Sequence, residues 1–149
     1  MQTFVIDTSV LARYFLDNPQ RGKVLELITL AVLGKVKLYA PYLIKYELYS
    51  VLIKNKVTKQ EVKDDFSLFN ELVNEDVIEI IDNEDAFNNG LELAFSNATG
   101  NQGYIGANDS YFHGLALALK CDFITNDIKH FNKTKDHIGN IKLFETLQF

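Results

Sequence analysis

The stretch Thr3-Phe4-Val5-Ile6-Asp7-Thr8-Ser9 decides the fold of this 149-residue chain. Its first four residues form an apolar, β-branched run without alternation, as expected of a strand that is buried on both faces. Asp7 ends the run, and we expect the hydroxyl of Thr8 or Ser9 to cap a helix that continues through Phe15. A buried strand that leads directly into a helix indicates a layered α/β fold.

Strand and helix patterns alternate along the rest of the chain. Further strands are predicted at residues 36–40, 77–81, 123–124 and 141–144. Helices are predicted at residues 20–33, 41–55, 58–73, 83–95 and 108–120, with Gly34 after the second helix, a capping box at Thr58 and Glu61, and Asn83 as a cap. Residues 97–106 are rich in Gly and Asn and predict an exposed loop. We therefore expect one domain over residues 1–149, a three-layer α/β/α sandwich around a central parallel sheet.

Composition excludes several classes of protein. A hydrophobic content of 47% with 23% charged residues excludes wholesale disorder. The longest apolar stretch, Leu27 to Leu33, is far shorter than the roughly 20 residues that span a bilayer, and the N-terminus lacks the pattern of a signal peptide. The single cysteine, Cys121, cannot form an internal disulfide, and we expect it in the core. These features predict a cytoplasmic protein with no membrane contact.

The net charge of −5 is unevenly distributed. Residues 61–92 carry eleven acids and one lysine, which predicts a solvated acidic surface. Residues 1–60 have a net charge of +5, and residues 93–149 are neutral. The overall charge therefore does not exclude a phosphate backbone as a ligand of the two flanking segments.

Four acids in those flanking segments, Asp7, Glu47, Asp109 and Asp127, fall where strands meet helices or within early helical turns. In an α/β fold the carboxyl ends of parallel strands open onto one crevice, where ligands usually bind. Carboxylates that gather there repel one another, and a hard divalent cation such as Mg²⁺ or Mn²⁺ relieves the repulsion. The pattern predicts metal-dependent phosphate chemistry.

Polar residues near the four acids have predicted supporting roles. Ser9 and Thr125 are placed to hydrogen-bond the carboxylates or a bound phosphate. Three cations either steer phosphates or are ordinary surface charges: Arg13, Lys45 and Lys129.

His113 follows Asp109 by four residues and therefore shares its helical face. We expect it to face solvent or a partner, and approach to the metal pocket is the alternative.

These motifs together resemble the PIN domain, and most closely the small VapC-type toxins. The resemblance rests on Val5 to Ser9, on Pro41 and Glu47 with five residues between them, on Asp109 near a helix start, and on Ile124 to Asp127 followed by Phe131. Each motif is short, but their order covers essentially the whole chain. Two departures are Ser110-Tyr111 and the length of the loop over residues 100–106.

The resemblance implies an endoribonuclease that depends on Mg²⁺ or Mn²⁺ and cleaves RNA with metal-activated water. It implies that the acids matching Asp7, Glu47, Asp109 and Asp127 form both the metal site and the catalytic site. VapC-like proteins typically form homodimers and are held inactive by a VapB antitoxin.

Two alternatives stay open from the sequence. One is a PIN-like binding module for RNA or protein that has lost catalysis, although such a module is expected to lack acids that this chain keeps. The other is a housekeeping RNA-processing nuclease without an antitoxin. A receiver-type signalling domain fits worst, because it needs two adjacent acids after the first strand and only Asp7 is present.

Overall fold

The computed structural model describes residues 1–96, 105–136 and 138–149. Five strands in this part of the chain form one sheet, and every hydrogen-bonded pair is parallel. In order across the sheet they are β3 (Ile78–Ile80), β2 (Val36–Ala40), β1 (Gln2–Ile6), β4 (Asp122–Thr125) and β5 (Ile141–Leu143). All five lie where the sequence predicts a strand.

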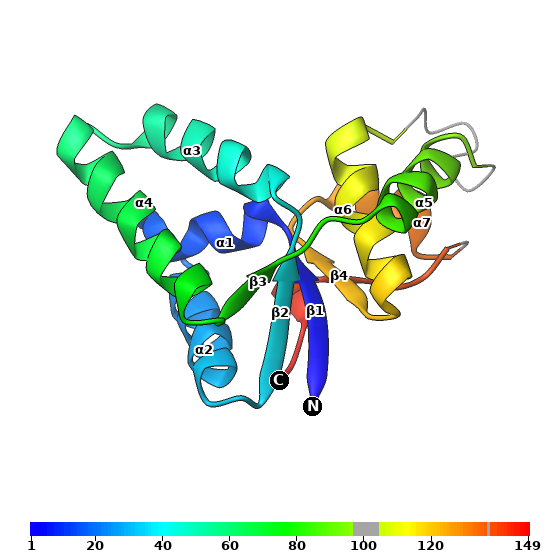
Figure 1. Ribbon diagram of the computed structural model, residues 1–149, viewed down its shortest axis with the longest axis horizontal. Helices are drawn as coiled ribbons and strands as arrows, with labels where there is room; N and C mark the ends of the chain where they lie inside the picture. Colours follow the sequence, from blue (N-terminus) through cyan, green and yellow to red (C-terminus); the bar gives the residue numbers. More distant parts are fainter. Residues whose placement is uncertain (97–104, 137) are drawn as a thin grey trace.

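Seven α-helices and one short 3₁₀ helix accompany the sheet in the described residues. They are α1 (Thr8–Phe15), α2 (Arg21–Val32), α3 (Leu43–Asn55), α4 (Lys59–Asn74), α5 (Glu84–Ala94), α6 (Ala107–Leu119), α7 (Ile128–Thr134) and η2 (Phe144–Thr146). Figure 1 shows α1 to α4 on one side of the sheet and α5 to α7 on the other. The predicted three-layer α/β/α sandwich is confirmed.

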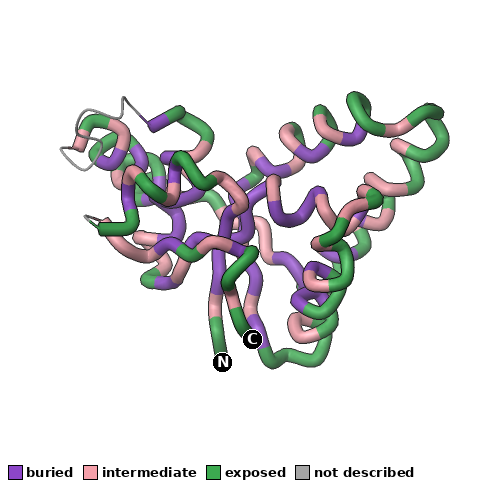
Figure 2. The backbone as a smooth tube through the Cα atoms, turned by 180° about the vertical axis from the view of Figure 1, so that it is seen from behind, coloured by how far each residue is buried: buried purple, intermediate pink, exposed green. Residues whose placement is uncertain are grey.

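The central strand β1 is buried along its second half, as its sequence predicts. Phe4, Val5 and Ile6 are at most 3% exposed, and Val5 lies in register between Tyr39 of β2 and Phe123 of β4. The buried segments gather where the strands meet the helices (Figure 2). A strand covered by helices on both faces must be apolar throughout, which explains the run without alternation.

Local signals set several helix ends. The side chain of Thr58 accepts a hydrogen bond from the backbone of Glu61, and the carboxylate of Glu61 accepts one from the backbone of Thr58, which completes the predicted capping box. Asn83 caps α5 by accepting a 2.6 Å hydrogen bond from the backbone of Ala86. Gly34 follows α2 with a φ of +68°, a conformation that favours glycine.

One prediction about a helix cap was wrong, and one helix was not predicted. The helix α1 begins at Thr8, with Asp7 in the cap position, and neither hydroxyl caps it, because Thr8 and Ser9 donate to carboxylates instead. The helix α7 was not predicted, because seven residues are too few to show a helical period. It begins where the carboxylate of Asp127 accepts a hydrogen bond from the backbone of His130.

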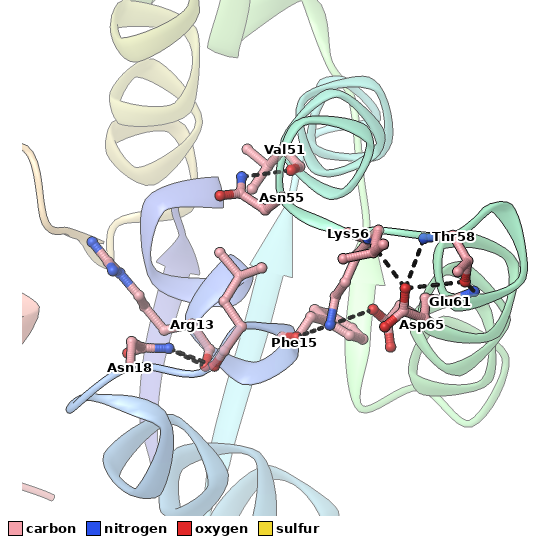
Figure 3. A network of polar contacts seen from close by, with 11 residues as sticks. Arg13, Phe15, Asn18, Val51, Asn55, Lys56, Thr58, Glu61 and Asp65 are labelled. Atoms are coloured by element: carbon pink, nitrogen blue, oxygen red, sulfur yellow. Dashed lines mark hydrogen bonds and ion pairs between the residues drawn. The ribbon is translucent and has the colours of Figure 1, made fainter.

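A polar network joins the end of α1 to the turn between α3 and α4 (Figure 3). The ammonium of Lys56, in that turn, donates to the carbonyl of Phe15 at 2.6 Å and pairs with Asp65 at 3.0 Å. This network fixes the C-terminal end of α1, the helix that Asp7 precedes. Within the part of the chain described above, no helix is long and apolar enough to cross a membrane.

Close packing of α5 on α6 positions the helix that carries Asp109. A Cβ at Gly114 of α6 would lie 2.6 Å from the backbone nitrogen of Gly90 in α5 and would also overlap the carbonyl of Ala86. Only glycine allows the two backbones to approach this closely.

Candidate active site

Asp7 lies at the centre of the candidate site, at the carboxyl end of β1. Its backbone nitrogen donates to the carbonyl of Ile124 at 3.0 Å, so the ends of β1 and β4 lie together. The hydroxyls of Ser9 and Thr125 each donate to Asp7 Oδ2 at 2.6 Å. The structure thus brings both predicted supporting residues to one carboxylate oxygen.

Burial raises the pKa of Asp7, whose side chain is only 5% exposed. The hydrogen bonds from Ser9 and Thr125 act in the opposite direction because they stabilise the charged form, and the nearby charge of Glu47 raises the pKa further. The chain therefore holds a carboxylate in the interior at a cost in free energy, with two hydroxyls that reduce this cost.

Glu47, on α3, lies beside Asp7 and connects three helices. Its Oε1 accepts a 2.8 Å hydrogen bond from the hydroxyl of Thr8, at the start of α1. Its Oε2 accepts a 3.1 Å hydrogen bond from the amide of Asn108, on α6. Both oxygens are held by protein donors, which fixes the orientation of this half-buried carboxylate.

Asp109 and Asp127 lie near each other at the starts of α6 and α7. Asp109 lies in the first turn of α6, and its pKa is raised to about 7. Desolvation is the largest cause, followed by the charges of Asp7 and Asp127, the hydrogen bond to Asp127, and the charge of Glu47. At pH 7 the carboxyl of Asp109 is therefore about half protonated, unlike an ordinary surface acid. The structure thus places the other three predicted acids within electrostatic reach of Asp109.

The donor chemistry of this cluster fits a hard divalent cation. Every candidate ligand is a carboxylate oxygen, and the groups that raise the pKa of Asp109 besides desolvation are acids. As the side chains lie, no three acid, histidine or cysteine side chains of the described residues converge as a ready-made metal site. Mg²⁺ is compatible with this arrangement, because it usually keeps several waters and binds one or two carboxylates.

The three predicted phosphate-steering cations lie in different settings. Arg13 is half-buried on α1, and its guanidinium points away from the Lys56 network (Figure 3). The ammonium of Lys45 lies over the ring of Tyr42, 5.1 Å from its centroid. Lys129 is exposed on α7, two residues after Asp127. Their role toward phosphates stays a prediction.

Several residues that hold the site were missed in the sequence. Asn126 donates to the backbone carbonyl of Ser9 and exchanges two hydrogen bonds with the amide of Gln20. Thr8 and Asn108 each adjoin a predicted acid in sequence, so adjacency was an available signal for both. No such signal exists for Gln20, because 106 residues separate it from Asn126.

The prediction that His113 faces solvent or a partner was wrong. The side chain is fully buried and hydrogen-bonded to His130 and to the carbonyl of Gly139. Cys121 is buried, as predicted, and desolvation raises its pKa to about 11, so it is a poor nucleophile. The predicted loop over residues 97–106 lies mostly outside the described residues.

Comparisons with known proteins identify the family and the fold of this chain. The PIN domain family model matches residues 4–136. A chain in the crystal structure of VapBC2 from Rickettsia felis bound to a DNA fragment from their promoter is 22% identical, with a TM-score of 0.68 over 95% of this chain and 97% of that chain. A chain in the structure of VapBC-1 from nontypeable Haemophilus influenzae is 20% identical, with a TM-score of 0.65 over 97% of this chain and 100% of that chain. A comparison with curated proteins found no match. At these identities the two structures show a shared fold.

Proposed function

The chain belongs to the PIN domain family, and from that premise we propose that it is an endoribonuclease dependent on Mg²⁺ or Mn²⁺. The observation that carries the proposal is the cluster of four acids, in which hydrogen bonds orient Asp7 and Glu47 and the other three acids help to raise the pKa of Asp109. A protein gains no stability from such a cluster, so a function explains it better than folding does.

The four acids have different parts in the proposed reaction. Asp7, fixed by Ser9 and Thr125, and Glu47, fixed by Thr8 and Asn108, are preorganised ligands for the ion. When bound, such an ion makes water more acidic and neutralises charge on the phosphate.

Asp109 and Asp127 complete the proposed ligand set on the α6 and α7 side. A proton on Asp109 must leave when the site is loaded, because a ligand carboxylate has to be ionised. Metal affinity should therefore increase as the pH rises through about 7.

We extend the proposal to the substrate and the partners. RNA phosphates would meet Arg13 and Lys129, which lie on the two helices that start beside Asp7 and Asp127. The toxin role and a VapB-like antitoxin are supported by the shared fold with the two VapBC structures. A homodimer is supported by exposed apolar side chains on α3 and α5, including Tyr46 (64% exposed) and Phe87 (62%).

The decisive experiment is a cleavage assay on single-stranded RNA. We expect the purified chain to cut RNA with Mg²⁺ or Mn²⁺ and to stop in EDTA, and we expect Asp109→Asn to abolish cleavage because it removes an ionisable ligand. Glu75→Gln is the matched control, since Glu75 is an exposed acid at the end of α4, outside the site. Cleavage by Asp109→Asn at the wild-type rate would refute the catalytic role.

The same preparation separates the alternatives. RNA binding without cleavage under any metal condition would indicate an inactive binding module. Cleavage without growth arrest on expression, and with no small DNA-binding antitoxin encoded in the neighbouring reading frame, would indicate an RNA-processing nuclease. Light scattering during size-exclusion chromatography tests the homodimer.

A further inference from the structure

A pair of buried histidines lies beneath the acids and connects two of the helices that carry them. His113 is one helical turn after Asp109 on α6, and His130 lies in the first turn of α7, whose cap is Asp127. His113 Nδ1 and His130 Nε2 are 2.9 Å apart. This hydrogen bond is a direct side-chain link between α6 and α7.

The carbonyl of Gly139 determines which nitrogens carry protons. It lies 2.8 Å from His113 Nε2 and can only accept, so His113 Nε2 must carry hydrogen. Burial lowers the pKa of both histidines to about 4, so both rings are neutral at pH 7. His113 Nδ1 is then an acceptor, and His130 Nε2 is the donor. The remaining nitrogen, His130 Nδ1, carries no hydrogen in this tautomer. It is buried and has no hydrogen-bond partner in the described residues, which agrees with this assignment.

Packing holds both rings in place. Phe123 of β4 lies 5.7 Å from the ring centroid of His113 and 5.6 Å from that of His130. The hydroxyl of Thr134 donates to the backbone carbonyl of His130, one turn further along α7. The two rings thus pack against the same side chain of β4 and hydrogen-bond each other, which ties α6 to α7.

The link continues to the carboxylates. The backbone nitrogen of His130 donates to Asp127 Oδ1 at 3.0 Å, and Asp127 in turn lies close enough to Asp109 to raise the pKa of Asp109. Building on the function proposed above, we propose that His113 is a positioning residue: through His130 it sets the start of α7, and thus Asp127, relative to Asp109 for binding of the divalent ion. His113 itself does not contact the ion.

The test measures Mn²⁺ binding to the free protein by calorimetry. His113→Phe keeps an aromatic ring against Phe123 but removes both hydrogen bonds, and we expect the Kd for Mn²⁺ to rise about tenfold, as is typical when a partner of a metal ligand is lost. His113→Gln offers one donor and one acceptor on its amide and should restore part of the affinity. Phe69→Leu is the control, because it leaves a cavity at a buried site on α4, away from the acids, and should bind Mn²⁺ like wild type.

Wild-type affinity in His113→Phe, or an equal loss in Phe69→Leu, would overturn the positioning role. Should His113→Phe fail to fold, nitrogen NMR of the wild-type imidazoles decides: we expect both rings as Nε2–H, and an Nδ1–H form of His113 would overturn the inference. Asp109→Asn distinguishes the two proposals. Wild-type Mn²⁺ affinity in that variant would refute the metal site itself, whereas its loss there together with unchanged binding in His113→Phe would refute only the role of His113.

Discussion

Replacing Asp109 by asparagine should stabilise the metal-free protein, although it should destroy activity. The pKa of Asp109 is raised from 3.8 to about 7, so the folded state resists ionisation of this side chain. An acid with a raised pKa in the folded state costs stability once the unfolded chain ionises. The cost is absent below pH 4, grows between pH 4 and about 7, and is complete above that pH. Asparagine keeps the size and a donor for Asp127 but cannot ionise.

The magnitude follows from the two pKa values. A tenfold change in proton affinity is worth about 1.4 kcal/mol, so the difference between 3.8 and about 7 sets an upper limit of roughly 4 kcal/mol. Asp109 is only half-buried, and solvent screening reduces this figure to about 2 kcal/mol. For a chain of this length that corresponds to an increase in Tm of about 6 °C.

The assay is urea and thermal unfolding of wild type and Asp109→Asn in EDTA, at pH 4 and at pH 8. We expect no difference at pH 4 and a more stable variant at pH 8. Addition of Mg²⁺ at pH 8 should reduce the gap, because only the wild type gains stability from a well-bound ion. Asp17→Asn, at an exposed position, controls for the loss of one negative charge.

A variant that is no more stable than wild type at pH 8 in EDTA would refute the raised pKa of Asp109. A gain of equal size in Asp17→Asn would assign the effect to net charge instead.

Two further outcomes follow from single contacts. Gly114→Ala should lower the free energy of unfolding by about 2 kcal/mol, because its Cβ would meet the backbone of α5. Gly22→Ala on α2 has open space around it and should raise that free energy by up to about 1 kcal/mol; urea unfolding measures both, and an equal effect of the two would exclude the close helix contact. Thr125→Val keeps the side-chain shape but removes a hydroxyl that donates to Asp7 and accepts from the backbone of Asp127, so Mn²⁺ affinity should fall about tenfold and Tm should fall as well. Unchanged affinity in calorimetry would show that Ser9 alone holds Asp7.

The fold followed from short-range signals. The unbroken apolar run before Asp7, the capping box at Thr58 and the glycine after α2 each depend on residues within a few positions, and each was confirmed. The short helix α7 was not predicted, because seven residues show no helical period and the hydrogen bond from His130 to its cap, Asp127, is visible only in the structure.

The sequence by itself determined the layered α/β fold and the strand positions. It also singled out four acids, from their places relative to the strands and helices and from their order along the chain. Only the tertiary structure decided what each side chain does. The hydroxyls of Thr8 and Ser9 bind carboxylates and do not cap the helix as predicted, and His113 is buried and hydrogen-bonded to His130. The physical reason is that a strand or a cap is stabilised by neighbours in sequence, whereas the pKa of Asp109 and the hydrogen bond between histidines 17 residues apart depend on how β1, β4, α6 and α7 are brought together.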